Sequence, residues 1–142
     1  MKIIVTGSLG NISKPLATEL VQKGHSVTVI SSKAERQKDI EAIGAKAAIG
    51  TMEDADFLSA TFKGADVVYV METLGAGAFF DPNYDVIAAH NKIGNNYKQA
   101  IEQSDFSRDV EKKKWFAMVC REPLTILYYI WKFLRLNLLN PV

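Results

Sequence analysis

Cysteine and histidine are scarce in this sequence of 142 residues, which contains one cysteine and two histidines. A single cysteine, Cys120, excludes a disulfide bond within the chain and a cysteine-based metal cluster. His25 and His90 have no cysteine, histidine or carboxylate near them in a pattern typical of metal ligands. We therefore expect no metal site, and we expect a structural role for both histidines.

Excess charge and long apolar runs are also missing. The net charge of +1 does not indicate nucleic acid or an anionic membrane as a partner. The apolar start Met1–Val5 is broken by Thr6-Gly7 and is too short for a secretory signal, so we expect a cytoplasmic protein. The apolar segment 124–139 is too short for a membrane span and carries two cations, so we expect none.

Apolar runs and amphipathic segments alternate along the first hundred residues. Short runs without polar alternation indicate strands buried on both faces, whereas apolar residues four apart indicate helices with one buried stripe. Strands are predicted at 3–5, 26–30, 45–49 and 67–71, with a fifth at 115–120, and helices at 12–23, 33–43, 54–62 and 83–103. This order predicts an α/β fold of the Rossmann type, a doubly wound parallel sheet with right-handed crossovers.

A glycine-bearing turn joins the first strand to the first helix. Gly7 lets the chain turn sharply off the strand, and Gly10 removes a Cβ where a pyrophosphate would approach the backbone. The N–H groups and the dipole at the helix start favour phosphate. The alternative is a tight loop without a ligand. We predict a dinucleotide site that includes Gly7, Ser8, Leu9, Gly10, Asn11 and Ile12.

The turn also carries a family resemblance. Residues 6–13 read Thr-Gly-Ser-Leu-Gly-Asn-Ile-Ser. This segment resembles the Thr-Gly-x-x-Gly-x-x-Gly opening of the NmrA-like group of atypical short-chain dehydrogenases/reductases, with Ser13 in place of the last glycine. Residues 62–68 and 91–96 resemble the family as well, so the resemblance covers 1–103. It implies a Rossmann domain that binds a nicotinamide dinucleotide, with Ser13 and Gly94 small enough for helices to pack closely on the sheet.

After its third strand the family places a Gly-Asp pair and an apolar residue. This chain has Gly50-Thr51-Met52, so the aspartate is missing. The resemblance implies that Thr51 and Met52 contact the adenine side of the cofactor.

The end of the second strand bears on the choice of cofactor. An NAD-selective site needs an acidic residue there for the ribose hydroxyls, and this position has none. Two hydroxyls followed by two cations suit a 2′-phosphate instead. The alternative is a solvated helix face, and NAD remains the alternative cofactor. We predict NADP, bound by Ser31, Ser32, Lys33 and Arg36.

The loop from Met71 to Pro82 follows the fourth strand, at the sheet edge where ligands bind in such folds. We predict cofactor contacts from Met71, Glu72 and Thr73. The alternative is a surface loop anchored in the core by Phe79 and Phe80.

Catalytic residues are harder to identify. Tyr128 and Lys132 have the spacing of a short-chain dehydrogenase tyrosine–lysine pair, in which the lysine lowers the pKa of the phenol. The serine expected after the fifth strand is replaced by Cys120. The apolar stripe around Tyr128 therefore favours a buried or partner-facing helix over 124–139.

The family pattern ends at Asp105, which divides the chain into an NAD(P)-binding Rossmann domain, 1–104, and an atypical C-terminal segment, 105–142. That segment is either a truncated or frame-shifted ending or a genuine short one. We expect an NADP(H)-binding protein related to NmrA-like reductases or redox sensors, without a complete catalytic lobe. One alternative is an active NAD(P)H-dependent oxidoreductase acting on quinone-like or carbonyl substrates. The other is an interaction protein whose 124–139 helix binds a partner or a second copy. A catalytic acid in the site would favour the enzyme.

Overall fold

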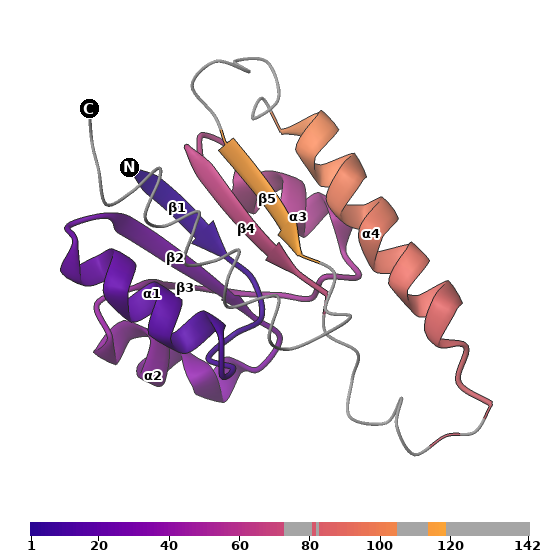
Figure 1. The fold of residues 1–142 in the computed structure, drawn as a ribbon, viewed down its shortest axis with the longest axis horizontal. Coiled ribbons are helices and arrows are strands. Elements are labelled where there is room, and N and C mark those ends of the chain that lie inside the picture. The colour runs from indigo at the N-terminus through magenta and orange to yellow at the C-terminus, as the bar shows by residue number, and fades with distance from the viewer. Residues whose placement is uncertain (73–80, 82, 105–113, 119–142) are drawn as a thin grey trace.

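A five-stranded parallel sheet forms the centre of the computed structural model, which describes residues 1–72, 81, 83–104 and 114–118 (Figure 1). The chain winds outward from the first strand to the third and then continues on the other side of the first strand. The resulting order is β3-β2-β1-β4-β5, which confirms the predicted doubly wound topology. The strands are β1 (Lys2–Val5), β2 (Ser26–Ser31), β3 (Lys46–Ile49), β4 (Val67–Met71) and β5 (Lys114–Met118).

Helices cover both faces of the sheet, as Figure 1 shows. They are α1 (Ser13–Gln22), α2 (Gln37–Ala42), α3 (Ala55–Phe62) and α4 (Val86–Gln103), with a short 3₁₀ helix, η1 (Ala34–Arg36), before α2. On one face α1 and α2 pack against the side chains of Ile3 and Val5. On the other face α3 and α4 pack against Ile4. Because successive strand residues point to opposite faces, β1 contributes to both cores.

Burial of the central strands agrees with their apolar sequences. Ile3, Ile4 and Val5 are at most 1% exposed, and all five residues of β4 are buried. Parallel pairing aligns Val5 with Val29 of β2 and with Tyr69 of β4. Full burial of an apolar side chain of this size contributes about 1.5–3 kcal/mol. β1 and β4 are therefore firmly held at the centre of the sheet.

Some helix and strand boundaries differ from the sequence prediction. The helix expected over 33–43 is split into η1 and α2 and ends at Ala42. The helix expected from Asn83 begins at Val86, because the Asp85 carboxylate accepts a hydrogen bond of 2.8 Å from the amide of Ala88. Asp54 caps α3 in the same way, as predicted, with 2.9 Å to the amide of Phe57.

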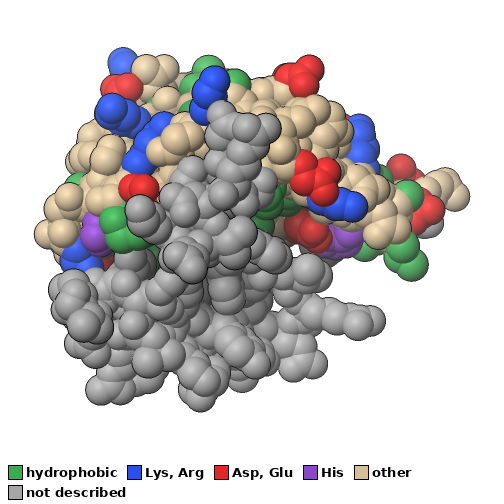
Figure 2. All heavy atoms as spheres, turned by 90° about the horizontal axis from the view of Figure 1, so that it is seen from above, with side chains coloured by type: hydrophobic (Ala, Val, Ile, Leu, Met, Phe, Trp, Pro, Cys, Tyr) green, Lys and Arg blue, Asp and Glu red, His purple; other side chains and the backbone are tan. Residues whose placement is uncertain are grey.

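The C-terminal segment is described only in part. The predicted fifth strand is present as β5, which pairs in parallel with β4. The predicted helix over 124–139 lies outside the described residues. None of the described helices is long and apolar enough to cross a membrane. On the face drawn in Figure 2, acidic and basic side chains are interspersed over the described surface.

Candidate functional site

The candidate site lies at the carboxyl ends of β1, β2 and β4. The chain leaves β1 toward α1 on one face of the sheet and leaves β4 toward α4 on the other. Adjacent parallel strands whose connections diverge in this way form the topological switch point where ligands bind in doubly wound sheets. Residues of the glycine-bearing turn, the β2 end and the β4 end meet at this edge.

The turn after β1 depends on two positions with a left-handed backbone. Gly7 has φ +88° and Ser8 has φ +55°. A Cβ at Gly7 would lie 2.4 Å from Met71 Cε and 2.8 Å from Ser13 Oγ. Both the backbone angle and the space around it therefore require glycine at position 7.

Gly10 has a second role besides the predicted one. A Cβ there would lie 3.2 Å from the carbonyl oxygen of Gly7, whose distance to the Gly10 amide nitrogen is 3.3 Å. Gly10 thus allows the turn to close on itself. The prediction that it also leaves room for a pyrophosphate stays a prediction.

The start of α1 has the character of an anion site. Ile12 occupies the N-cap position without a side-chain capping bond, and the first turn contains no acidic residue. Several amides at a helix start lack intrahelical partners, and they attract anions together with the helix dipole. The residues present therefore fit the phosphate groups of a dinucleotide.

Two buried hydroxyls hold this turn against the sheet. Ser13 Oγ donates to the Thr6 carbonyl oxygen at 2.8 Å. Thr6 Oγ1 accepts from the Met71 amide at 2.7 Å, which ties the end of β1 to the end of β4. Ser13 is fully buried, so it is small enough for α1 to pack on the sheet, as expected.

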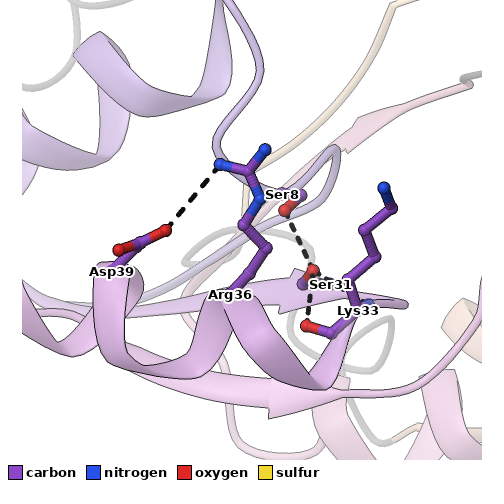
Figure 3. A network of polar contacts seen from close by, with 5 residues as sticks. All are labelled: Ser8, Ser31, Lys33, Arg36 and Asp39. Carbon is purple, nitrogen blue, oxygen red and sulfur yellow. Dashed lines mark hydrogen bonds and ion pairs between the residues drawn. The ribbon is translucent and has the colours of Figure 1, made fainter.

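Ser31 supports the turn from β2. Its hydroxyl accepts hydrogen bonds from Ser8 Oγ at 2.9 Å and from the Lys33 amide at 3.2 Å (Figure 3). The Ser31 residue is 2% exposed. In the structure the Ser31 hydroxyl orders the neighbouring backbone, and its predicted contact with the cofactor phosphate stays a prediction. Ser32, next in the chain, is exposed.

The two cations predicted to bind a 2′-phosphate are exposed beside this network. In Figure 3 the side chains of Lys33 and Arg36 extend to the same side of the β2 end as Ser8. Arg36 lies 3.8 Å from the Asp39 carboxylate, and both side chains are about half exposed (46% and 62%). Exposed ion pairs of this kind stabilise a protein by only about 0–1 kcal/mol, so Asp39 does not prevent Arg36 from binding another anion.

The segment after β3 forms a further side of the site. The Gly50 amide donates to the Ser31 carbonyl oxygen at 3.0 Å, and a Cβ at Gly50 would lie 2.5 Å from the Phe57 ring. The side-chain amide of Asn96 donates to the Met52 carbonyl oxygen at 3.1 Å. Thr51 is exposed and Met52 partly so, which leaves both accessible for the predicted adenine contact.

The end of β4 carries a pair that sequence reasoning missed. The Glu72 carboxylate lies 2.8 Å from His90 Nδ1, with 14% of the Glu72 side chain and 30% of the His90 side chain exposed. The two residues are separated by 18 positions, and a spacing of that length carries no recognisable sequence signal. A Cβ at Gly94 would lie 3.3 Å from Glu72 Oε1. Gly94 therefore makes room for this carboxylate, in addition to the close helix packing predicted for it.

Tyr97 completes this side of the site and lies about two helical turns after His90 along α4. Its hydroxyl donates to the Met71 carbonyl oxygen at 3.0 Å. Burial raises the pKa of Tyr97 strongly, the Thr6 hydroxyl lowers it to a smaller extent, and the charge of Glu72 raises it further. Tyr97 therefore stays protonated and anchors the backbone beside Glu72.

The remaining predicted residues are not described. Thr73, Cys120 and the tyrosine–lysine candidates Tyr128 and Lys132 lie outside the described residues. Within the described part of the chain, no group of three or more histidine, cysteine, aspartate or glutamate side chains is placed to hold a metal ion.

The comparison with known protein families agrees with this geometry. Residues 7–122 match a family described as NAD(P)H-binding. The chain belongs to this NAD(P)H-binding family. The match begins at Gly7 and includes the turn, the β2 end and the β4 end.

One relative of this NAD(P)H-binding protein is a reductase. A 4-hydroxy-2-methyl-3-oxo-4-farnesyl-3,4-dihydroquinoline-1-oxide ketoreductase from Stigmatella aurantiaca is 29% identical over 84 residues, which are 59% of this chain and 25% of the relative. The chain thus matches about a quarter of that relative's length.

Solved structures share the fold. Yeast methylglyoxal/isovaleraldehyde reductase, complexed with NADPH, has a TM-score of 0.65 and 14% identity over 84% of this chain and 36% of its own. Triphenylmethane reductase from Citrobacter sp. has a TM-score of 0.58 and 18% identity over 73% of this chain and 34% of its own. The NAD(P)H-binding protein spans about a third of both chains.

Proposed function

We propose that this NAD(P)H-binding protein binds NADPH in preference to NADH. The observation that carries the proposal is the pair of exposed cations, Lys33 and Arg36, at the end of a strand that has no carboxylate there. Charge-assisted hydrogen bonds from these side chains favour the 2′-phosphate, which NADH lacks. The NADPH bound to the yeast reductase is consistent with this choice.

Each part of the cofactor has candidate partners in the described residues. The turn Gly7–Ile12 and the start of α1 would hold the pyrophosphate, and Thr51 and Met52 would lie on the adenine side. The nicotinamide end would point toward the end of β4, beside Met71 and Glu72. All of these residues lie within 1–104, the Rossmann domain, so we expect this domain to carry the whole cofactor site.

A second candidate function is reduction of carbonyl or quinone-like substrates, in a protein related to the NmrA-like reductases. The similarity to the Stigmatella ketoreductase supports a carbonyl substrate, and the residues 6–13 support the NmrA-like relation. NADPH would supply the hydride. The Glu72–His90 pair favours this function over binding alone, because a histidine held by a carboxylate can serve as a proton donor.

A charge-removal variant tests the cofactor preference. In Lys33→Ala/Arg36→Ala, the affinity for NADPH should fall toward that for NADH by about 1.5–3 kcal/mol per strong charge-assisted bond lost. Lys46→Ala/Lys98→Ala is a matched control, because both lysines are exposed, lie away from the carboxyl ends of β1, β2 and β4, and carry the same charge. Calorimetric titration with both cofactors gives the result. An equal loss of NADPH affinity in the two double variants would contradict a specific phosphate site.

A further inference from the structure

The Glu72–His90 pair differs from the other side-chain ion pairs at this edge of the sheet. The Lys92–Glu53 pair joins two side chains that are each 60% exposed, which is typical of a solvated surface bridge. Glu72, in contrast, is only 14% exposed. A carboxylate that is largely removed from water needs a hydrogen-bond partner, and His90 Nδ1 supplies one at 2.8 Å.

The surroundings hold the Glu72 end of this pair in place. Hydrogen bonds from Tyr97 Oη to the Met71 carbonyl and from the Met71 amide to Thr6 Oγ1 fix the backbone of the residue that precedes Glu72. Gly94 leaves space for the carboxylate on the same side of α4 that carries His90, one turn earlier. The Glu72 carboxylate is therefore held in position by its surroundings, unlike the carboxylate of an exposed surface pair.

The strand end that precedes Glu72 also borders the dinucleotide turn. Met71, the residue before Glu72, contacts the position where Gly7 lacks a side chain and is hydrogen-bonded to Thr6. Glu72 thus comes directly after the strand end that borders the proposed cofactor site, and His90 reaches Glu72 from α4.

From this placement we propose that His90 is the proton donor for reduction of a ketone at this site, and that Glu72 is its positioning residue. The proposal rests on the proposed NADPH site. Because the Glu72 carboxylate is an acceptor, it holds the proton of His90 on Nδ1. The opposite ring nitrogen, Nε2, then carries the second proton of the imidazolium and can release it.

NADPH held by the turn Gly7–Ile12 with Lys33 and Arg36 would supply a hydride, with its electron pair, for the carbonyl carbon. The π pair of the carbonyl moves to oxygen, the Nε2–H bond of His90 breaks, and an O–H bond forms. The product is an alcohol, and His90 is left neutral with Nδ1–H still bonded to Glu72. A general acid positioned in this way contributes a factor of about 10²–10⁴ to the rate.

The first test locates His90 relative to the cofactor and needs no substrate. NMR signals of the His90 imidazole are followed while the full chain is titrated with NADP⁺ and, separately, with 2′-phospho-ADP-ribose, which lacks nicotinamide. We expect NADP⁺ alone to shift these signals, with the signals of His25 unchanged by either compound. If both compounds bind by calorimetry and His90 responds equally to them, the inference is wrong and the proposed NADPH site stands. If neither compound binds, the proposed function itself is wrong, and the inference fails with it.

The second test examines Glu72. In neutral His90 the imidazole nitrogen spectrum should show the Nδ1–H tautomer, and Glu72→Ala should convert it to the Nε2–H form that free imidazole side chains favour. Glu72→Ala should also lower kcat for phenanthrenequinone reduction by NADPH. An unchanged tautomer, or a changed tautomer with unchanged kcat, would remove Glu72 from the proposed role.

The third test examines turnover. His90→Gln keeps an amide that can donate to Glu72 but removes the transferable proton, so kcat with phenanthrenequinone should fall about 100-fold or more. The KM for NADPH and the melting temperature should stay close to those of the parent chain. His25→Gln, the same change at the other histidine, should leave kcat unchanged. A kcat for His90→Gln within threefold of the parent, or a parent chain that binds NADPH and reduces no ketone, would overturn the proposal.

Discussion

The Ser13 hydroxyl donates a hydrogen bond of 2.8 Å to the main-chain carbonyl oxygen of Thr6, across the glycine-bearing turn. Both residues are fully buried. The bond joins the first turn of α1 to the end of β1 and so fixes the two ends of the proposed phosphate site. Serine at this position, where the similar family has glycine, contributes a contact that glycine lacks.

Removing that hydroxyl should destabilise the protein. Ser13→Ala leaves the buried Thr6 carbonyl without this donor, at a cost of about 1–3 kcal/mol in the free energy of unfolding. Thr18→Ala is the matched control, because the Thr18 hydroxyl donates to the Lys14 carbonyl oxygen at 2.9 Å on the exposed side of the same helix. Its cost should be within about 0.5 kcal/mol. If urea unfolding shows the same loss of unfolding free energy for both variants, the buried Ser13 bond stabilises the protein no more than the exposed Thr18 bond.

Gly7 and Gly24 allow backbone strain to be separated from crowding. Both have φ near +80° (+88° and +79°), but a Cβ at Gly7 would meet Met71 and Ser13, whereas one at Gly24 would meet nothing within 4 Å. Gly24→Ala should cost about 1–2 kcal/mol from the left-handed backbone. Gly7→Ala should cost a further 1–3 kcal/mol or so from overpacking and should also weaken NADPH binding. Unfolding free energies from urea titration give both values, and similar values would contradict the crowding at Gly7.

His25 should make stability depend on pH. Burial lowers the pKa of His25 below its usual value of 6.5, and the charges of the N-terminus and Lys23 lower it further. Its Nε2 is also buried without a hydrogen-bond partner among the described residues. At pH values between the lowered pKa and the usual value of 6.5, the unfolded chain binds more protons than the folded one. The unfolding free energy should therefore decrease as pH falls from 7.5 through 6.5 toward the lowered pKa.

The control for this pH effect is His25→Gln, which should flatten the pH dependence, with His90→Gln as the comparison at the other histidine. Urea titrations at several pH values measure the slope. A slope that persists in His25→Gln would assign the effect to other groups.

Much of the scaffold was predictable because it depends on local sequence. The apolar runs of β1 and β4 indicated strands buried on both faces, and all described residues of these runs are buried except Lys2 at the start of β1. The Asp54 cap and the left-handed Gly24 also follow from residues close in sequence. The alternation of strands and helices predicted a doubly wound parallel sheet, and the structure adds the strand order β3-β2-β1-β4-β5.

The contacts that define the site were less predictable because they join distant residues. Glu72 and His90 lie on either side of a long connection, so their pairing depends on how α4 returns along the sheet. The sequence predicted Ser31 as a ligand of the 2′-phosphate. The burial of Ser31 and its hydrogen bond with Ser8, however, depend on the tertiary fold. Similarly, the expectation that His90 is only structural came from its sequence neighbours, which do not include Glu72.

We propose above all that NADPH binds at the carboxyl ends of β1, β2 and β4. Calorimetric titration of the full chain with NADPH and NADH, in the same buffer and at the same salt concentration, tests it most directly. We expect both cofactors to bind and NADPH to bind at least about tenfold more tightly than NADH, a difference of about 1.4 kcal/mol. Equal affinities would contradict the role of Lys33 and Arg36, and failure of both cofactors to bind would contradict the site itself.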